Sequence, residues 1–245
     1  MAIIYEPKGK AKEYSDLAAN LFKGCDHGCL YCYAPGIPPA KFRPREEFYE
    51  VKNRNEVVKQ IRKEAPAYKD KEILLCFTCD PYSHFAGEAG ITRQAIETLH
   101  DGGATVNILT KGGNRSTADF DLLTAADKYG TTLTFLNDED SLKWEPRAAL
   151  PAERIAALKT AKAAGISTWA SFEPVIDPEQ TLELIEMTHG ITDFYKVGKW
   201  NHDVRADEID WHSFAKRAKA LLENLGVAYM IKKDLAAFLT EGAEQ

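Results

Sequence analysis

The stretch Asn20-Leu-Phe-Lys-Gly-Cys-Asp-His-Gly-Cys-Leu-Tyr-Cys-Tyr33 holds three of the chain's five cysteines, Cys25, Cys29 and Cys32, within eight residues. It follows an apolar run at residues 17–22, so we expect a loop that opens directly after the first strand. A glycine precedes each of the first two cysteines and lets the backbone fold back on itself. Three thiolates at these spacings can hold one corner of an iron–sulfur cube and leave one iron without a protein ligand. We therefore expect a 4Fe-4S cluster with an open coordination position on this loop.

His27 offers a second interpretation, because three cysteines and one histidine are a common ligand set of structural zinc. The histidine stands two residues from each of Cys25 and Cys29, and so tight a loop places it poorly for sharing their metal. A small zinc-binding α/β module without catalysis is the alternative to an iron–sulfur enzyme. It predicts stoichiometric zinc and no visible absorption.

The composition is that of a globular protein, which we expect in the cytoplasm. The chain has 245 residues, of which 44% are apolar and 28% charged. No apolar run approaches the ~20 residues that span a bilayer, and the N-terminus lacks the features of a signal peptide. Crowded cysteines in odd number indicate metal ligation in a reducing compartment and not a disulfide framework. The formal net charge of -6 argues against a surface that grips nucleic acid as a whole.

Short apolar runs alternate with helical patterns along the chain, which predicts a series of β-α units. The expected strands cover residues 17–22, 73–77, 105–109, 131–135, 167–172, 194–197 and 227–231. Several of the intervening helical windows end in glycine, as at Asp101-Gly102, Tyr129-Gly130 and Leu225-Gly226. Six or seven such strands predict an α/β fold, a partial (β/α)6 barrel of mainly parallel strands with outer helices. A doubly wound open sheet is the alternative.

No linker, low-complexity tract or repeat divides the chain. We therefore expect one domain over residues 1–245, with a closing segment over about 205–245. In a parallel α/β fold the loops after the strands meet at the carboxyl end of the sheet. Polar residues at the strand ends are thus the candidates for the functional site.

The cysteine stretch resembles the signature of the radical S-adenosylmethionine superfamily. Its spacing is C-x3-C-x2-C with Tyr31 before the third cysteine, and the string N-x3-G-C-x-H-x-C-x-Y-C-Y is similar to the branch that contains spore photoproduct lyase. The resemblance implies that S-adenosylmethionine chelates the open iron through its amino and carboxylate groups, with Tyr31 as a cofactor contact. It also implies that a one-electron reductant, such as flavodoxin or ferredoxin, triggers release of methionine and a 5'-deoxyadenosyl radical. That radical takes a hydrogen atom from the substrate.

Polar side chains follow several of the later strands and are candidate cofactor contacts. Thr78 and Asp80 follow the second expected strand, where members of the superfamily usually contact the amino group of S-adenosylmethionine. Capping of the following turn is an equally open role for Asp80. Three further strand ends supply Lys111, Glu173 and Lys196. Lys111 suits a carboxylate or a ribose, and Glu173 suits ribose hydroxyls.

Cys76 and Cys79 form a second, shorter pair. Residues three apart on an extended strand point to opposite faces, so the pair cannot share a metal unless the strand has already turned, and we place Cys76 in the core. Cys79 is the candidate catalytic residue, a hydrogen-atom donor like the cysteine of spore photoproduct lyase. That cysteine lies three residues before the matching aspartate, where this chain has Phe77, so the role does not carry over by position.

The sequence leaves the substrate open. Spore photoproduct lyase repairs a thymine dimer in DNA, and residues 41–72 here are mildly basic and aromatic, with ten Lys/Arg against seven Asp/Glu. A solvated helix face of mixed charge is the simpler interpretation of this stretch. A nucleic-acid lesion or a nucleotide is thus one candidate substrate, beside a peptide or a small metabolite. The segment Met230-Ile-Lys-Lys-Asp234 resembles the closing segment of the same branch, with Lys232 facing the pocket.

Overall fold

The computed structural model describes residues 2–38, 40–54 and 56–240 of the chain. The strands described there are β1 (Ile4–Tyr5), β2 (Ala18–Ala19), β3 (Phe22–Lys23), β4 (Lys52–Asn53), β5 (Glu72–Leu75), β6 (Thr105–Thr110), β7 (Lys128–Thr132), β8 (Ser167–Val175), β9 (Phe194–Lys199) and β10 (Ala228–Ile231). The α-helices described there are α1 (Arg45–Tyr49), α2 (Val57–Glu64), α3 (His84–Ala89), α4 (Ile91–Asp101), α5 (Asp138–Trp144), α6 (Pro151–Ala163), α7 (Pro178–Thr188), α8 (Trp211–Asn224) and α9 (Lys233–Thr240). Of the expected closing segment, residues 241–245 lie outside the described residues.

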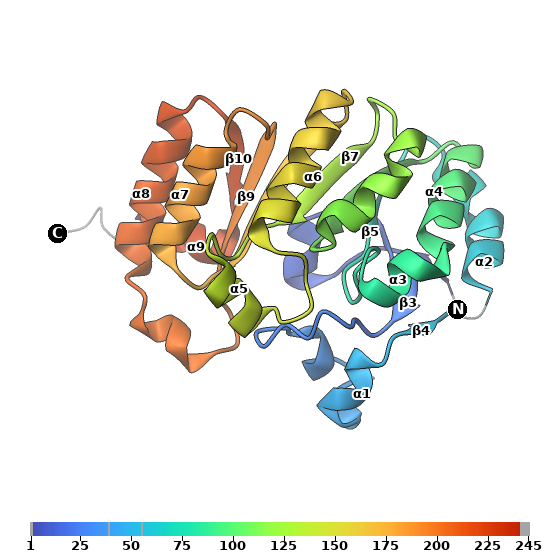
Figure 1. Ribbon diagram of the computed structural model, residues 1–245, viewed down its shortest axis with the longest axis horizontal. Coiled ribbons are helices and arrows are strands. Elements are labelled where there is room, and N and C mark those ends of the chain that lie inside the picture. Colours follow the sequence, from blue (N-terminus) through green and yellow to red (C-terminus); the bar gives the residue numbers. More distant parts are fainter. Residues whose placement is uncertain (1, 39, 55, 241–245) are drawn as a thin grey trace.

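The strands form one main sheet whose order follows the chain (Figure 1). Within the described residues it has eight strands in the order β1-β2-β5-β6-β7-β8-β9-β10. β1 pairs antiparallel with β2, and every later neighbour is parallel. Parallel neighbours need crossover connections, and most of these are helical. The predicted fold class, a partial barrel of mainly parallel strands with outer helices, is confirmed.

The longer helices α4, α6, α7 and α8 pack on the outer side of the sheet, and the main core lies between the two layers (Figure 1). α4 and α6 contact β6, β7 and β8, while α7 and α8 contact β8 and β10. α4 and α8 end at Asp101 and Asn224, next to two of the predicted glycine stops. Within the described residues, no helix combines the length and the apolar character needed to span a bilayer.

A smaller set of side chains fills the inner side of the sheet. Ala18, Leu74 and Trp169 form a separate buried cluster, and Tyr14 packs against it. The indole Nε1 of Trp169 donates to Oδ1 of Asn107 at 2.8 Å, so the ring is fixed in place. Because side chains fill the inner side of the sheet, a functional site is expected at the carboxyl ends of the strands, as in other β/α barrels.

The strand predicted at 131–135 begins earlier, as β7 over Lys128–Thr132. Asp127 closes a tight turn just before it, because its Oδ2 accepts from the backbone N–H of Thr124 and its Oδ1 from that of Val106, both at 2.8 Å. The predicted helix end at Tyr129-Gly130 is therefore wrong, and these residues lie within β7. Gly130 leaves room for the Trp169 ring, since a Cβ at Gly130 would lie 2.2 Å from Cε2 of Trp169.

The strand predicted at 17–22 is divided in two. β2 covers only Ala18–Ala19 in the main sheet, whereas β3 pairs antiparallel with β4 in a separate two-stranded sheet. Asn20 lies at the break, where its side-chain Oδ1 accepts from the backbone N–H groups of Phe77 and Thr78 at 2.8 and 2.9 Å. This amide takes the place of ladder hydrogen bonds, so the chain leaves the sheet and enters the cysteine loop.

Candidate active site

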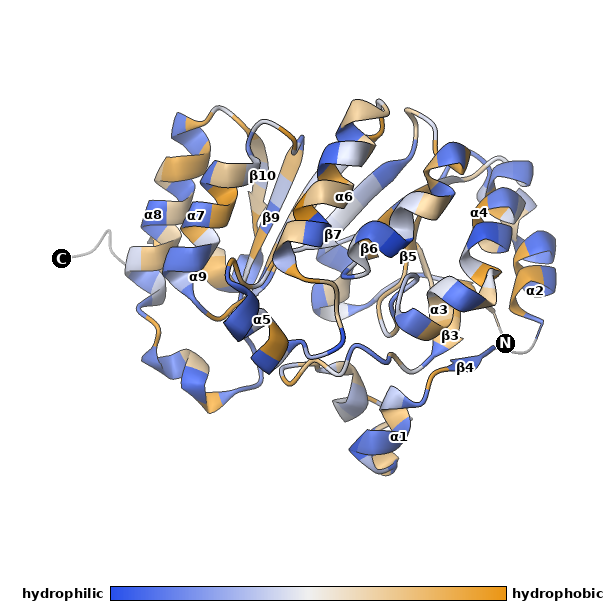
Figure 2. Cartoon of the chain, in the orientation of Figure 1, coloured by the Kyte–Doolittle hydropathy of each residue, from blue (hydrophilic) through white to orange (hydrophobic). Residues whose placement is uncertain are grey.

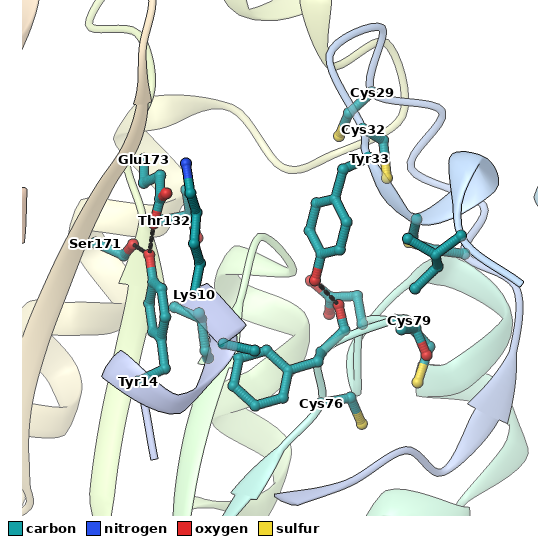
Figure 3. Close-up of a pocket in the computed structure, with 18 of the residues that line it drawn as sticks. Lys10, Tyr14, Cys29, Cys32, Tyr33, Cys76, Cys79, Thr132, Ser171 and Glu173 are labelled. Carbon is teal, nitrogen blue, oxygen red and sulfur yellow. Dashed lines mark hydrogen bonds between the residues drawn. The ribbon is translucent and has the colours of Figure 1, made fainter. Parts of the chain in front are cut away.

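A cavity of about 850 Å³ lies at the carboxyl ends of the strands (Figure 3). The predicted site residues that line it are Cys25, Cys29, Tyr31, Cys32, Thr78, Cys79, Asp80, Lys111 and Glu173. Lys196 lies outside this lining, and its ammonium donates to the backbone oxygen of Tyr14 at 2.8 Å. The volume is typical of sites that enclose a small molecule or cofactor.

The cysteine loop is held in shape by its backbone. Cys29 is buried, and Cys25 and Cys32 are half-buried. The N–H of Cys25 donates to the backbone oxygen of Phe48 at 3.0 Å, and the N–H of Cys32 donates to that of Cys29 at 3.1 Å. Gly24 has φ of 84°, and a Cβ there would lie 2.3 Å from the oxygen of Phe48. The approach of this second segment therefore requires glycine before the first cysteine.

Burial controls the protonation of the three thiols. It raises the pKa of Cys29 to about 12 and also raises the pKa values of Cys25 and Cys32. The ammonium of Lys111 acts against burial at Cys29 and Cys32, because it favours a thiolate. Thiols of high pKa keep their protons until a metal replaces them, so metal binding by this loop releases protons.

A buried group of charges lies behind the loop. Arg154 donates from Nη2 to Oε2 of Glu145 at 2.5 Å, and these side chains are 1% and 0% exposed. Glu145 also accepts a hydrogen bond from the hydroxyl of Tyr31, and the Lys111 ammonium lies 5.5 Å from the centre of the Tyr31 ring. The ion pair thus fixes Tyr31 beside the cysteines. Nothing in the sequence places Arg154 or Glu145 at the site, because a lone Arg or Glu is usually exposed.

Asp80 is engaged in hydrogen bonds within the protein. Its Oδ1 accepts from the N–H of Tyr82 at 2.8 Å and from Oγ1 of Thr110 at 2.6 Å, and its Oδ2 accepts from the N–H of Lys111 at 2.8 Å. Nδ1 of His27 lies 3.5 Å from the same Oδ2. Burial lowers the pKa of His27 to about 4, so this imidazole is neutral. Asp80 therefore joins the ends of β5 and β6 to the cysteine loop, which matches its turn-capping interpretation.

Glu173 belongs to a hydrogen-bonded group on the opposite side of the cavity (Figure 3). Its Oε2 accepts from the hydroxyl of Tyr14 at 2.5 Å and from Nζ of Lys232 at 2.6 Å. Ser171 Oγ lies 2.9 Å from the same hydroxyl. Burial, followed by the charge of Glu173, raises the pKa of Tyr14. The prediction that Lys232 of the closing segment faces the cavity is confirmed. Tyr14 was not predicted, because nothing in the N-terminal sequence indicates that it reaches the cavity.

Cys76 and Cys79 lie together, because the strand has already ended before Cys76, and Cys76 is buried in the main core as predicted. β5 ends at Leu75, so the alternation of a strand no longer applies to either cysteine. Both thiols are buried and both line the cavity. Burial, and then the neighbouring Cys79 thiol, raise the pKa of Cys76. In Figure 3 the ring of Tyr33 lies between this pair and the cysteines of the loop, and its hydroxyl donates to the backbone oxygen of Phe77 at 3.1 Å.

The family model of the radical SAM superfamily matches residues 19–190. An uncharacterized protein of Mycobacterium tuberculosis is 26% identical over 166 residues, which are 64% of this chain and 48% of the relative. An uncharacterized protein of Methanocaldococcus jannaschii is 29% identical over 181 residues, 72% of this chain and 67% of the relative. The chain thus spans about half the length of the mycobacterial relative.

Two solved structures share the fold. A mutant of spore photoproduct lyase superposes with a TM-score of 0.68 at 13% identity, covering 93% of this chain and 79% of that one. SuiB of Streptococcus suis bound to S-adenosylmethionine superposes with a TM-score of 0.64 at 13% identity, covering 91% of this chain and 52% of that one. At such identity the likeness concerns the fold alone. Because a family model matches the cysteine loop and the chain from there through β8, the chain belongs to the radical SAM superfamily.

Proposed function

We propose that the chain is a radical SAM enzyme in which Cys25, Cys29 and Cys32 hold a 4Fe-4S cluster and S-adenosylmethionine binds in the same cavity. The main support is that the three thiols share one cavity with charged side chains from the ends of other strands, among them Lys111 and Glu173. A bound cluster would supply the electron that splits S-adenosylmethionine into methionine and a 5'-deoxyadenosyl radical.

The loop suits a cluster better than a single zinc ion. Three sulfurs that share one zinc each lie about 2.3 Å from it, whereas a cube takes each sulfur at a different iron. In the described part of the chain, no three Cys, His, Asp or Glu side chains converge as a site for one ion. His27, the fourth ligand that zinc would need, faces Asp80 and Arg115 at 3.5 and 3.4 Å.

Residues around the loop would bind and orient the cofactor. Tyr31, fixed by Glu145, offers its ring beside the cysteines. Lys111 is the candidate partner of the cofactor's carboxylate, and the chain around Thr78 is the candidate for its ammonium. We assign Asp80 mainly to holding the ends of β5 and β6, because its carboxylate already accepts three short hydrogen bonds. These assignments keep the reacting end of the cofactor beside the cysteine loop.

The opposite side of the cavity would face the substrate. Glu173 is our candidate for ribose or substrate hydroxyls, with its geometry set by Tyr14 and Lys232. Lys196 supports the ring of Tyr14 from behind, since its ammonium lies 4.8 Å from the ring centre. Cys79, whose thiol lines the cavity, is our candidate hydrogen-atom donor.

For the substrate we propose a nucleotide or a nucleic-acid lesion. Among the described residues, the lining has five lysines and two carboxylates. Lys10 is paired with Asp234 and Lys232 with Glu173, so three lysines remain against the carboxylate of Asp80, and this excess of positive charge suits a phosphate. A spore photoproduct lyase mutant of the same fold was solved with S-adenosylmethionine and a dinucleoside spore photoproduct.

Formation of 5'-deoxyadenosine tests the proposed activity. The chain is reconstituted anaerobically with iron and sulfide, reduced with dithionite and mixed with S-adenosylmethionine, and the nucleoside is measured by mass spectrometry. We expect product from the wild type and from Cys76→Ala, which removes a thiol from the same cavity, but none from Cys29→Ala. A wild-type protein that binds iron and forms no 5'-deoxyadenosine would contradict the proposal.

A further inference from the structure

Two buried thiols flank a short bend of the chain after β5. This strand ends directly before Cys76 and the chain bends over residues 77–79, so Cys76 and Cys79 are not part of an extended strand. Both thiols are free, belong to the main core and line the cavity. Oδ1 of Asn20 accepts from the N–H groups of Phe77 and Thr78 at 2.8 and 2.9 Å, which fixes the middle of the bend. The bend therefore holds one thiol at each end, on the wall of the cavity. In Figure 2 the strands and helices around β5 show the apolar residues that make up this core.

The two thiols are neighbours. In Figure 3 both lie on the side of the Tyr33 ring that faces away from Cys29 and Cys32. After burial, a hydrogen bond to the Cys79 thiol is the next cause that raises the pKa of Cys76. A disulfide forms without movement of the backbone only where two cysteine side chains already approach one another. The bend after β5 places this pair in that way.

The charges around this pair differ from those around the cysteine loop. The ammonium of Lys111 favours a thiolate at Cys29 and Cys32. At Cys76 the carboxylate of Asp80 disfavours a thiolate. Among the residues that the structure describes, the pair belongs to no group of three side chains that could hold a metal ion. A dithiol and a disulfide are both uncharged, so oxidation of the pair places no charge in the core, whereas a thiolate would.

We propose that Cys76 and Cys79 form a reversible disulfide, so that the wall of the cavity carries a two-electron redox site separate from the cysteine loop. The chemical partner is a small disulfide, such as oxidised glutathione, that enters the cavity. One cysteine releases its proton to water and attacks the small disulfide as a thiolate, which expels one small thiolate. The second cysteine, which also gives up its proton, attacks the mixed disulfide and expels the other. Two cysteine thiols are thereby oxidised, and one small disulfide is reduced to two thiols.

The disulfide would change the chemistry of the cavity. An S–H bond is weaker than a C–H bond, so a thiol gives a hydrogen atom to a carbon radical, whereas a disulfide has no hydrogen to give. Oxidation of the pair therefore removes the hydrogen-atom donor proposed at Cys79. This consequence rests on the proposed function, but formation of the disulfide does not depend on it.

The mass of one tryptic peptide tests the disulfide. Cleavage after Lys71 and Arg93 releases residues 72–93, which contain Cys76 and Cys79 and no other cysteine, whereas the loop cysteines fall in residues 24–41. The reconstituted protein is incubated anaerobically with an excess of oxidised glutathione, unfolded in N-ethylmaleimide to block free thiols, and digested. We expect peptide 72–93 to be lighter by two hydrogen atoms and to carry no maleimide.

Reversal and a matched variant complete the test. Strongly oxidising disulfides are those whose thiolate is stabilised in the reduced protein. Because burial and Asp80 disfavour the thiolate of Cys76, we expect dithiothreitol to reduce the disulfide only when it is in excess over its own oxidised form, after which the peptide takes up two maleimides. In Cys79→Ser, which keeps a side chain of similar size, Cys76 has no partner, and the peptide should show a free thiol or one bound glutathione.

Three results would overturn the disulfide: two maleimides on peptide 72–93 of the oxidised sample, two bound glutathiones, or a bridge from either cysteine to the loop. Formation of 5'-deoxyadenosine by the same reduced preparation separates this inference from the proposed function. If 5'-deoxyadenosine forms and the peptide keeps two free thiols, the disulfide alone is wrong. If the peptide loses two hydrogen atoms and no 5'-deoxyadenosine forms, the disulfide stands and the proposed function is wrong.

Discussion

Asp80 accepts hydrogen bonds from the N–H of Tyr82, from Oγ1 of Thr110 and from the N–H of Lys111, and it is 8% exposed. We expect Asp80→Ala to lower the free energy of unfolding by about 2–4 kcal/mol, because it leaves buried donors without an acceptor. Urea unfolding measures the change, and Asp101→Ala at the exposed end of α4 is the control. Equal midpoints for the two variants would show that Asp80 does not hold the strand ends together.

Lys196 gives the fold a dependence on alkaline pH. Burial lowers its pKa from 10.5 to about 8, while Glu72 and Glu13 favour the charged form and Lys128 and Lys232 oppose it. Below pH 8 the folded and unfolded states both carry the proton, and between pH 8 and 10.5 only the unfolded state keeps it. The contribution of Lys196 to the free energy of unfolding should therefore rise with pH in this window, by on the order of 3 kcal/mol, whereas the buried thiols, whose pKa values burial raises, contribute a fall above about pH 9.

Lys196→Met removes the titrating group and provides the comparison. Urea unfolding at intervals from pH 7.5 to 10 should show that the free energy of unfolding of the wild type rises relative to that of the variant, because both proteins share the buried thiols and only the wild type has Lys196. Parallel profiles for the two proteins would mean that Lys196 does not titrate in this range.

At the residue scale, the sequence could predict those site residues that follow strands. Cys25, Thr78 and Lys111 meet at one cavity because parallel strands bring their carboxyl ends together. Tyr14 and Arg154 could not be predicted in this way. Tyr14 comes from the segment between β1 and β2 and Arg154 from the start of α6, and only tertiary packing brings them to the site.

β7 and β8 show how packing between elements sets a boundary that local pattern does not. The ring of Trp169 on β8 fills the space where a Cβ of Gly130 on β7 would stand. Gly130 resembles a helix end in the sequence, but it is a strand residue that has no side chain because the Trp169 ring fills that space. The first strand is likewise shortened by Asn20, whose side chain bonds to the chain after β5. The spacing of apolar residues and the positions of glycines predicted the order of the elements. They did not predict where β7 begins or where the first strand ends.

Gly130→Ala tests this contact between elements. We expect it to lower the free energy of unfolding by about 1–3 kcal/mol, because the added methyl group overlaps the Trp169 ring. Trp169→Phe in the same chain should recover part of the loss, since it frees space beside residue 130. Gly190→Ala is the matched control, because no atom lies within 4 Å of the position of its Cβ. A Gly130→Ala protein as stable as the Gly190→Ala protein would contradict the packing account.

Over the whole molecule, we propose that the described chain folds as one domain. The main sheet is continuous from β1 to β10, and helices from both halves of the chain pack on its outer side. Circular dichroism reports on all helices, whereas fluorescence reports on the four tryptophans, Trp144, Trp169, Trp200 and Trp211. Their urea transitions should coincide, as expected for cooperative unfolding. Two separated transitions would indicate two independently folding parts.

The molecule as a whole is a partial barrel that brings three cysteines to a cavity large enough for a cofactor. Electron paramagnetic resonance of the reconstituted, dithionite-reduced protein, with and without S-adenosylmethionine, tests this account most directly. We predict about four irons per chain and a cluster signal whose g values change when S-adenosylmethionine binds the open iron. A protein that holds one zinc and no iron, or a cluster signal that S-adenosylmethionine leaves unchanged, would contradict it.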